Sequence, residues 1–98
     1  MARVIYSQRA FADLERLTDF LQEENPIEAA KTISLITEAV RFLENHPLIG
    51  RPAEQGIKEL VIARGKSGYL ALYSYEKLHD KVLILAVRHQ REAGYLQE

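Results

Sequence analysis

The spacing of the apolar residues changes once along the chain, and this change constrains the fold more than any other feature. Before residue 45, apolar residues recur every three or four positions, as on one face of an amphipathic helix. After residue 58 they come in short runs rich in β-branched and aromatic residues, which are typical of strands. The segment between them, "NHPLIGRP" at 45–52, has two prolines and a glycine and cannot continue a helix. After one short strand at the N-terminus, we therefore expect helices and then the rest of a sheet.

The first half predicts one strand and two helices. "RVIY" at 3–6 has the composition of a short strand, and Ser7 can cap the helix that follows it. "NPIE" at 25–28 is a start signal for the second helix, because it combines a capping Asn, a Pro in the first helical position and a Glu at the capping-box position. The apolar stripes are Ala10, Leu14, Leu17 and Leu21, then Ala29, Ile33, Ile36, Val40 and Leu43. The charged residues Asp13, Glu15, Arg16, Asp19 and Glu23 are expected on the other faces of the first helix. A connection of about four residues would make the two helices an antiparallel hairpin.

The second half predicts three strands. These are "ELVIAR" at 59–64, "YLALYSY" at 69–75 and "KVLILAV" at 81–87, separated by the short turn-like segments "GKSG" and "KLHD". Such spacing favours a three-stranded antiparallel meander. The third run is apolar at successive positions, so it should be central or covered on both faces. One face of the sheet must bury against the helix hairpin, which predicts a single α+β domain over residues 1–98.

Composition excludes several classes of site. The chain of 98 residues has no cysteine, so it has no disulfide, thiolate metal site or cysteine nucleophile. Its three histidines lack the spacing of metal ligands, and "GKSG" lacks the length and context of a phosphate loop. We expect no metal and no other cofactor. The N-terminus resembles no signal peptide and no run approaches the roughly 20 apolar residues of a membrane span, so a cytoplasmic protein without a membrane partner is expected.

The charge balance argues against a free-standing nucleic-acid binder. The net charge is −1, whereas such proteins usually present a strongly basic face. Residues 1–45 carry five Lys and Arg against eight Asp and Glu, and residues 46–98 carry eight against six. The asymmetry permits a local basic patch on the second half of the chain.

A cationic cluster follows the last predicted strand, in "AVRHQREAGY" at 86–95. Arg88, His89 and Arg91 either form a solvated cluster that protects a sheet edge or are a functional patch delivered to that edge. Tyr95, four residues after Arg91, either closes the core or belongs to the same patch. Arg64 and Lys66 flank a predicted turn and are either solvated or part of a binding surface. Tyr69, Tyr73 and Tyr75 alternate along one strand, which favours a core face over a platform for stacking bases.

The order of elements and four segments together resemble the RelE/ParE superfamily of toxins of type II toxin–antitoxin systems. The segments are "VIYSQRAFADLERLTDFL", "FLENHPLIGRP", "ARGKSGYLALYSY" and "VLILAVRHQREAGY", in this order and over nearly the whole chain. The resemblance implies a toxin of a plasmid-stabilisation system that arrests growth. RelE-like members are ribosome-dependent ribonucleases, whereas ParE-like members inhibit DNA gyrase by binding.

The match to the ribonuclease branch is partial. Tyr95 and Arg91 match its late tyrosine and the arginine four residues earlier, but His89 stands where a catalytic arginine is usual. Histidine could still act as an acid or base, since its unperturbed pKa is about 6.5. Leu70 stands where that branch carries a catalytic arginine after the Gly-Tyr pair. A ribosome binder should also be strongly basic. These departures favour the ParE-like branch, with a ribonuclease using His89, Tyr95 and Arg91, or a non-toxic interaction module, as alternatives.

The resemblance also implies partners. A cognate antitoxin would neutralise the chain through an acidic segment, and the toxin would reach operator DNA only through that antitoxin. DNA gyrase is the expected target, and the ribosome with its mRNA is the alternative. The basic residues Arg64, Lys66, Arg88 and Arg91 are the expected contacts to the target or partner.

Overall fold

In the part of the chain that the structure describes, the fold consists of two α-helices and five strands. The computed structural model describes residues 1–64 and 67–91, with the backbone alone at 63, 64 and 67. The elements are β1 (Arg3–Tyr6), α1 (Gln8–Glu24), α2 (Pro26–Arg41), β2 (Arg51–Pro52), β3 (Lys58–Arg64), β4 (Ser67–Glu76) and β5 (Lys81–His89). The strand and helices predicted for the first half, and the three strands predicted for the second, are confirmed within a few residues at their ends.

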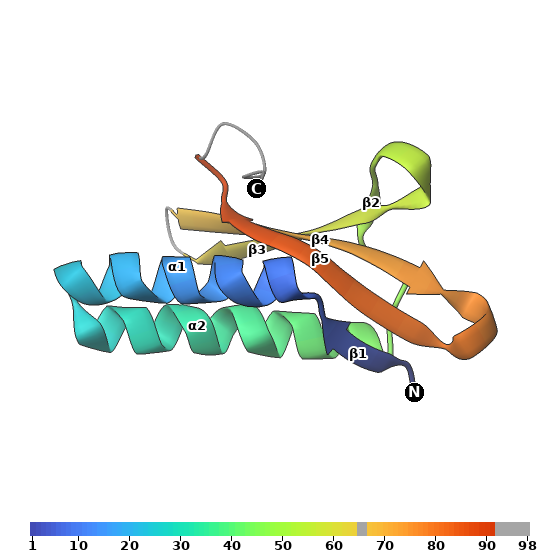
Figure 1. Cartoon of the computed structure of the whole chain (residues 1–98), viewed down its shortest axis with the longest axis horizontal. Helices are drawn as coiled ribbons and strands as arrows, with labels where there is room; N and C mark the ends of the chain where they lie inside the picture. Colours follow the sequence, from blue (N-terminus) through green and yellow to red (C-terminus); the bar gives the residue numbers. More distant parts are fainter. Residues whose placement is uncertain (65–66, 92–98) are drawn as a thin grey trace.

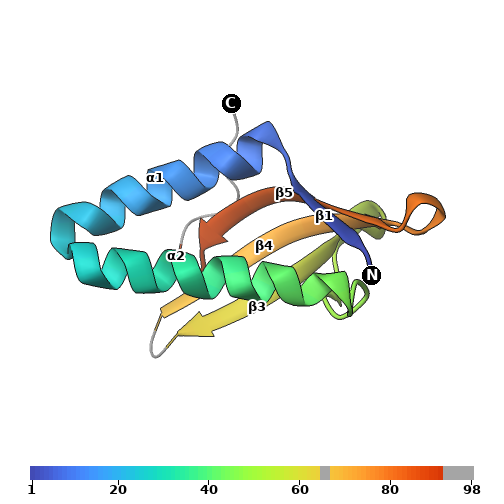
Figure 2. The same ribbon diagram turned by 90° about the horizontal axis from the view of Figure 1, so that it is seen from below.

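The strands form one mixed sheet in the order β1-β5-β4-β3-β2, with β1 parallel to β5 and the other pairs antiparallel. Both helices lie side by side against one face of it (Figures 1 and 2). The predicted α+β architecture is therefore confirmed, and β5 is an interior strand as its apolar run indicated. Two features had no signal in the local pattern, namely the two-residue β2 and the pairing of β1 with a strand about 80 residues later.

Asn25 alone connects the two helices, so the expected connection of about four residues was wrong. Its backbone N–H donates to Leu21 O at 2.9 Å and so closes α1. Its Oδ1 accepts from the N–H groups of Ile27 at 3.1 Å and Glu28 at 3.2 Å and so caps α2. A turn this tight is possible because one residue satisfies backbone groups of both helix ends.

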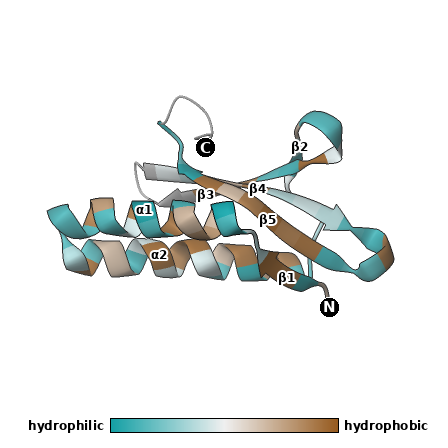
Figure 3. Cartoon of the chain, viewed as in Figure 1, coloured by the Kyte–Doolittle hydropathy of each residue, from teal (hydrophilic) through white to brown (hydrophobic). Residues whose placement is uncertain are grey.

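The core lies between the helix hairpin and the sheet. Figure 3 shows the most hydrophobic continuous stretch along β5, next to apolar positions of the helices. The largest fully buried side chains are Ile36, Val40, Leu43, Tyr73, Val82, Ile84 and Val87. The predicted helical stripes supply the other side of this core, with Leu14, Leu21 and Ile33 half-buried at its margin. Within the described residues, neither helix has the length and apolar content needed to cross a membrane.

The buried Tyr73 fixes the segment that separates helices from sheet. Its hydroxyl donates to Pro47 O at 2.8 Å and accepts from Gly50 N at 2.9 Å. A Cβ at Gly50 would lie 2.7 Å from the ring and hydroxyl of Tyr73. Close approach of this loop to the strand therefore requires glycine at that position.

Candidate functional site

On the edge that faces away from β4, the end of β5 is held by α1 and not by another strand. β1 pairs with β5 only as far as Ile84, and a bulge follows at Leu85. Beyond that point Ser7 donates from its N–H to Ile84 O at 2.9 Å and from its hydroxyl to Leu85 O at 3.2 Å. Asp13 then accepts from Val87 N–H at 2.8 Å. These bonds fix the strand that leads into the predicted cationic cluster.

Asp13 corrects the prediction that the charged residues of α1 lie on its outer faces. The residue is only 6% exposed, because its side chain turns toward the sheet to satisfy Val87 N–H. Arg16 lies 3.9 Å from its carboxylate and is itself half-buried. Helical spacing gave no sign of this inward pair, since the need for an acceptor arises only because β5 continues past the last residue that pairs with β1.

The predicted cluster is divided between the two faces of the sheet. Tyr69 is paired with His89, and Leu70 with Arg88, so His89 shares the helix-covered face with Tyr69 while Arg88 shares the other face with Leu70. Arg88 is half-buried, and its NH1 donates to the carbonyls of His89 at 3.2 Å and Gln90 at 3.3 Å. The Arg88 side chain therefore satisfies backbone carbonyl groups at the end of its own strand.

His89 is held from two sides. Its ring meets the Tyr69 ring edge to face, with centroids 5.1 Å apart and planes at 83°. Its Nδ1 accepts from Arg91 N–H at 3.0 Å. Since Nδ1 is the acceptor, the neutral ring carries its proton on Nε2, which can donate to a ligand.

A hollow of about 450 Å³ opens between α1 and the ends of β4 and β5, and we call it the α1–β5 hollow. It is lined by Arg16, Leu17, Phe20, Leu21, Tyr69, His89 and Arg91. The structure therefore brings together two predicted residues, His89 and Arg91, with Arg16 and Phe20, which sequence reasoning missed. Phe20 lies outside the apolar stripe of α1 and is 59% exposed. A large apolar residue off the stripe was the available signal for it.

The remaining predicted site residues are only partly located. Arg64 ends β3 at the same end of the sheet as His89, where its backbone pairs with Ser67. Lys66 and Tyr95 lie outside the described residues. Leu70, at the position of the arginine in the ribonuclease branch, is 2% exposed. The expected patch of Arg64, Lys66, Arg88 and Arg91 is thus placed only for the backbone of Arg64, for Arg88 near the end of β5 and for Arg91 just after it.

The tyrosines of β4 form a core face, as predicted. Tyr69 and Tyr73 are buried, and Tyr75 is half-buried. Burial raises the pKa of Tyr73, and the hydrogen bond to Asp80 at 2.8 Å raises the pKa of Tyr75. With their rings packed in this way, Tyr69 and Tyr73 offer no platform for stacked bases.

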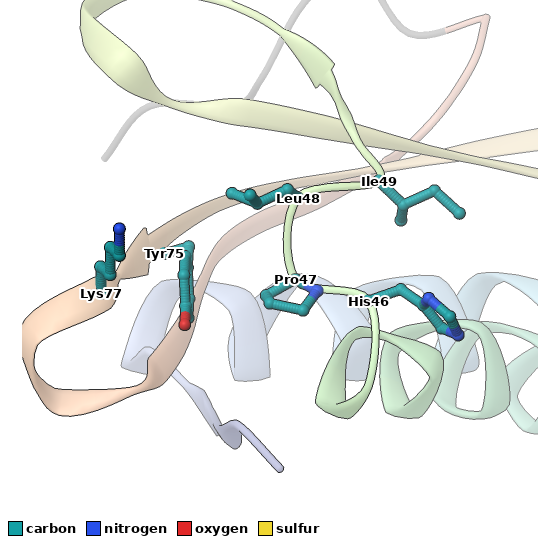
Figure 4. Close-up of a pocket in the computed structure, with 6 residues that line it drawn as sticks. All are labelled: His46, Pro47, Leu48, Ile49, Tyr75 and Lys77. Atoms are coloured by element: carbon teal, nitrogen blue, oxygen red, sulfur yellow. The ribbon is translucent and has the colours of Figure 1, made fainter.

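A second hollow, of about 570 Å³, lies at the opposite end of β4 (Figure 4). His46, Pro47, Leu48 and Ile49 line it from the loop after α2, and Tyr75 and Lys77 from the end of β4. Leu48 and Ile49 are 64% and 55% exposed, so its surface is mostly apolar. None of the predicted site residues contributes to it. In residues 1–64 and 67–91, no three His, Asp or Glu side chains are grouped closely enough to hold a metal ion.

Comparison with known sequences places this chain among bacterial toxins. Residues 4–94 match the family described as "ParE toxin of type II toxin-antitoxin system, parDE". Toxin RelE3 of Caulobacter vibrioides is 33% identical over 92 residues, covering 94% of this chain and 98% of that protein. Toxin RelE2 of the same organism is 32% identical over 62 residues, covering 63% and 70% respectively.

Comparison with solved structures agrees. A chain of the chromosomal ParDE toxin–antitoxin system from P. aeruginosa superposes with a TM-score of 0.74 and 25% identity, covering 91% of this chain and 96% of that one. A chain of the RelBE2 toxin–antitoxin complex from Mycobacterium tuberculosis gives a TM-score of 0.64 and 26% identity, covering 91% and 98%. The likeness therefore extends over nearly the whole chain in both cases.

Proposed function

The chain belongs to the ParE toxin family of type II toxin–antitoxin systems, and we propose that it arrests growth by binding and inhibiting DNA gyrase. In this proposal the protein has no chemistry of its own and acts through a binding surface at the end of β5. Two arguments support gyrase as the target. One is the family resemblance, and the other is that a residue which a ribonuclease would need is replaced in this chain.

The observation that carries the choice of gyrase is the burial of Leu70. Metal-free RNA cleavage needs cationic or acid–base side chains that offset the phosphate charge and transfer protons. Leu70 stands where RelE-like toxins place one of these cations, and it is 2% exposed and opposite Arg88 in the sheet. A buried aliphatic side chain can supply neither charge nor proton, and the net charge of −1 also disfavours a ribosome binder.

Pulse labelling after induction in bacteria tests the proposed target. Thymidine incorporation should fall first while methionine incorporation continues. Purified chain should then inhibit supercoiling by gyrase or trap cleaved DNA, with an equal amount of chain pre-mixed with its antitoxin as the control. Unchanged supercoiling and cleavage would remove gyrase as the target.

A RelE-like ribonuclease is the second candidate, because two of the similar sequences are named RelE toxins. His89 and Tyr95 would then serve as the acid and base, while Arg91, Arg64 and Lys66 would contact phosphate. Methionine incorporation would fall first, and mRNA would be cut in translating ribosomes. Full toxicity of His89→Ala and Tyr95→Phe variants would exclude this mechanism. A non-toxic interaction module would be excluded by growth arrest itself.

A cognate antitoxin is the proposed partner, since the two solved structures compared above come from toxin–antitoxin systems. Co-expression should raise the yield of the chain, restore growth and give a complex that purifies together. Operator DNA should bind the complex and not the isolated chain. Failure of any second protein to co-purify would count against the pairing.

A further inference from the structure

The two helices leave a furrow between them, and Figure 2 looks onto the helix pair from that side. Two adjoining hollows of about 500 and 220 Å³, which share Tyr6 and Thr37, make up the furrow. Its walls are two rows of side chains spaced four residues apart, and residues at this spacing share one face of a helix. The rows are Phe11, Glu15 and Asp19 on α1, and Ile33, Thr37 and Arg41 on α2. We call this furrow the hairpin groove.

The middle of the hairpin groove is apolar. Leu14 and Ile33 are half-buried there, and Phe11 is 60% exposed beside them. The hydroxyl of Thr18 donates to Leu14 O at 2.7 Å, and that of Thr37 donates to a carbonyl of α2 at 3.1 Å. Both threonines therefore satisfy their hydroxyl groups within their own helices. A partner that covers Phe11 would remove a large aromatic surface from water, which is favourable.

The two ends of the hairpin groove carry opposite charges. Glu15 and Asp19 are exposed toward the end with the connection between the helices, and Arg41 is exposed at the other end. Glu44 also lines the Arg41 end, but in residues 1–64 and 67–91 none of these four side chains forms an ion pair. Like charges four residues apart destabilise a helix slightly, so a cation from outside would stabilise Glu15 and Asp19.

Arg41 is directed along the groove toward its apolar part. Burial raises the pKa of Tyr6, and the positive charge of Arg41 partly opposes that rise, so the guanidinium lies near the Tyr6 ring. The same ring meets Phe11 edge to face, with centroids 6.2 Å apart. Basic, aromatic and acidic groups therefore follow one another along a single furrow.

This order of groups is complementary to itself. Ile33 and Arg41 mark the two ends on α2, and eight residues at 1.5 Å per residue separate them by about 12 Å. A two-fold axis through the middle of the groove would bring the basic end of one copy to the acidic end of the other, twice over. The same rotation would lay each Phe11 over the apolar floor of the opposite groove. A second copy thus supplies every group that the groove lacks.

We infer that the hairpin groove is a homodimer interface, in which Arg41 of each copy pairs with Glu15 and Asp19 of the other and each Phe11 packs into the opposite groove. The interface lies on the helices and not at the end of β5. The inference therefore does not depend on the proposed function, and growth arrest and gyrase inhibition are separate measurements.

Sedimentation velocity of the purified full-length chain over a range of concentrations gives the first test. The wild-type chain should show a reversible monomer–dimer equilibrium. Arg41→Glu should weaken the dimer at least about tenfold, because it sets like charges against each other in both halves of the interface. The double variant Glu15→Arg with Asp19→Arg should do the same. Lys77→Glu, an equal charge change in the exposed turn between β4 and β5, is the control and should dimerise like the wild type.

A mixture of the two charge variants is the sharper test. In a mixed dimer the reversed groups meet each other in one half, and the wild-type groups meet in the other half. Both contacts then join opposite charges. An equimolar mixture should therefore form a dimer of nearly wild-type affinity, although neither variant dimerises well alone.

Phe11→Ala tests the apolar part, with Phe42→Ala as the matched control. Phe42 is 49% exposed and stacks on His46, outside the groove. Only Phe11→Ala should weaken the dimer, by about fivefold or more. Variants are compared after circular dichroism has shown native helix content.

Each outcome decides the inference. A wild-type chain that stays monomeric at every concentration would overturn it. A dimer that both Arg41→Glu and Phe11→Ala leave intact would also overturn it, since another surface would then form the dimer. The same holds if the mixed charge variants remain monomeric. If the groove variants lose a co-expressed antitoxin while the wild-type chain is monomeric, the groove serves that partner and not a second copy.

Discussion

Asp13 and Val87 are joined by a buried hydrogen bond of 2.8 Å, in which a helix carboxylate accepts the N–H that a neighbouring strand would otherwise satisfy. β1 is too short to reach this part of β5, and its last paired residue is Tyr6. The bond therefore lets a four-residue edge strand support a nine-residue interior strand.

Asp13→Ala should destabilise the fold by about 1–3 kcal/mol, because it leaves the buried Val87 N–H without an acceptor. Asp13→Asn keeps a carbonyl oxygen at this position and should cost less. Urea denaturation of the purified variants measures both. Asp19→Ala, on the exposed side of the same helix, is the control and should stay within about 0.5 kcal/mol of the wild type. Equal stability of Asp13→Ala and the control would show that the bond contributes nothing.

Tyr73→Phe should cost about 1–3 kcal/mol, since it leaves Gly50 N–H and Pro47 C=O unpaired inside the protein. Tyr75→Phe is the matched control. It loses a hydrogen bond to Asp80 at the exposed end of the same strand, and water can replace that partner. Denaturation midpoints for the two variants should therefore differ clearly. If Tyr75→Phe lowered the free energy of unfolding as much as Tyr73→Phe, the role assigned to the buried hydroxyl would be contradicted.

The same tyrosines predict the response to high pH. Burial raises the pKa of Tyr6 and of Tyr73, and the hydrogen bond to Asp80 raises that of Tyr75. A folded-state pKa above the unfolded value means that the unfolded chain loses its protons first. Stability should be complete below about pH 10 and fall as pH rises through the folded-state values. Unfolding free energies at pH 8 and above pH 10 should show this fall, with a shallower decline in Tyr73→Phe. Parallel curves for the variant and wild type would contradict it.

The parts of the fold that were predictable are those with local causes. Ser7 accepts from Ala10 N at 3.0 Å, as its place before the first helix indicated. The strands of the meander were found because short turn segments separate apolar runs. The two-residue β2 was not predicted, because no periodicity can be recognised in so short a segment. The parallel pairing of β1 with β5 was not predicted either, because it depends on residues about 80 positions apart.

The site was less predictable for the same reason. The sequence placed Arg88, His89 and Arg91 together because they are neighbours in the chain. In a strand, successive side chains point to opposite faces, so Arg88 and His89 are separated by the sheet. Arg16 and Phe20 join His89 only through the packing of α1 on β5, which no local pattern encodes.

Asn25→Ala should destabilise the fold by about 1 kcal/mol, because it removes the acceptor of the Ile27 and Glu28 N–H groups. Asn25→Asp should be close to neutral, since the carboxylate keeps the cap and favours the positive end of α2. Thermal denaturation of both variants gives the comparison. If Asn25→Asp lost as much stability as Asn25→Ala, the capping side chain would not be the stabilising feature of this one-residue connection, and its backbone would be.

Leu70→Arg tests whether the ribonuclease branch could be restored by one substitution. The new guanidinium would lie at a site that is 2% exposed and directly opposite Arg88. Burying a charge beside a like charge should cost more than about 2 kcal/mol and should yield a destabilised chain without mRNA cleavage. Val61→Arg is the control, because Val61 is the partner of Leu70 on β3, shares its face and is 47% exposed. It should fold like the wild type. A stable Leu70→Arg variant that cuts mRNA in translating ribosomes would show instead that this β4 position is all that separates the chain from a ribonuclease.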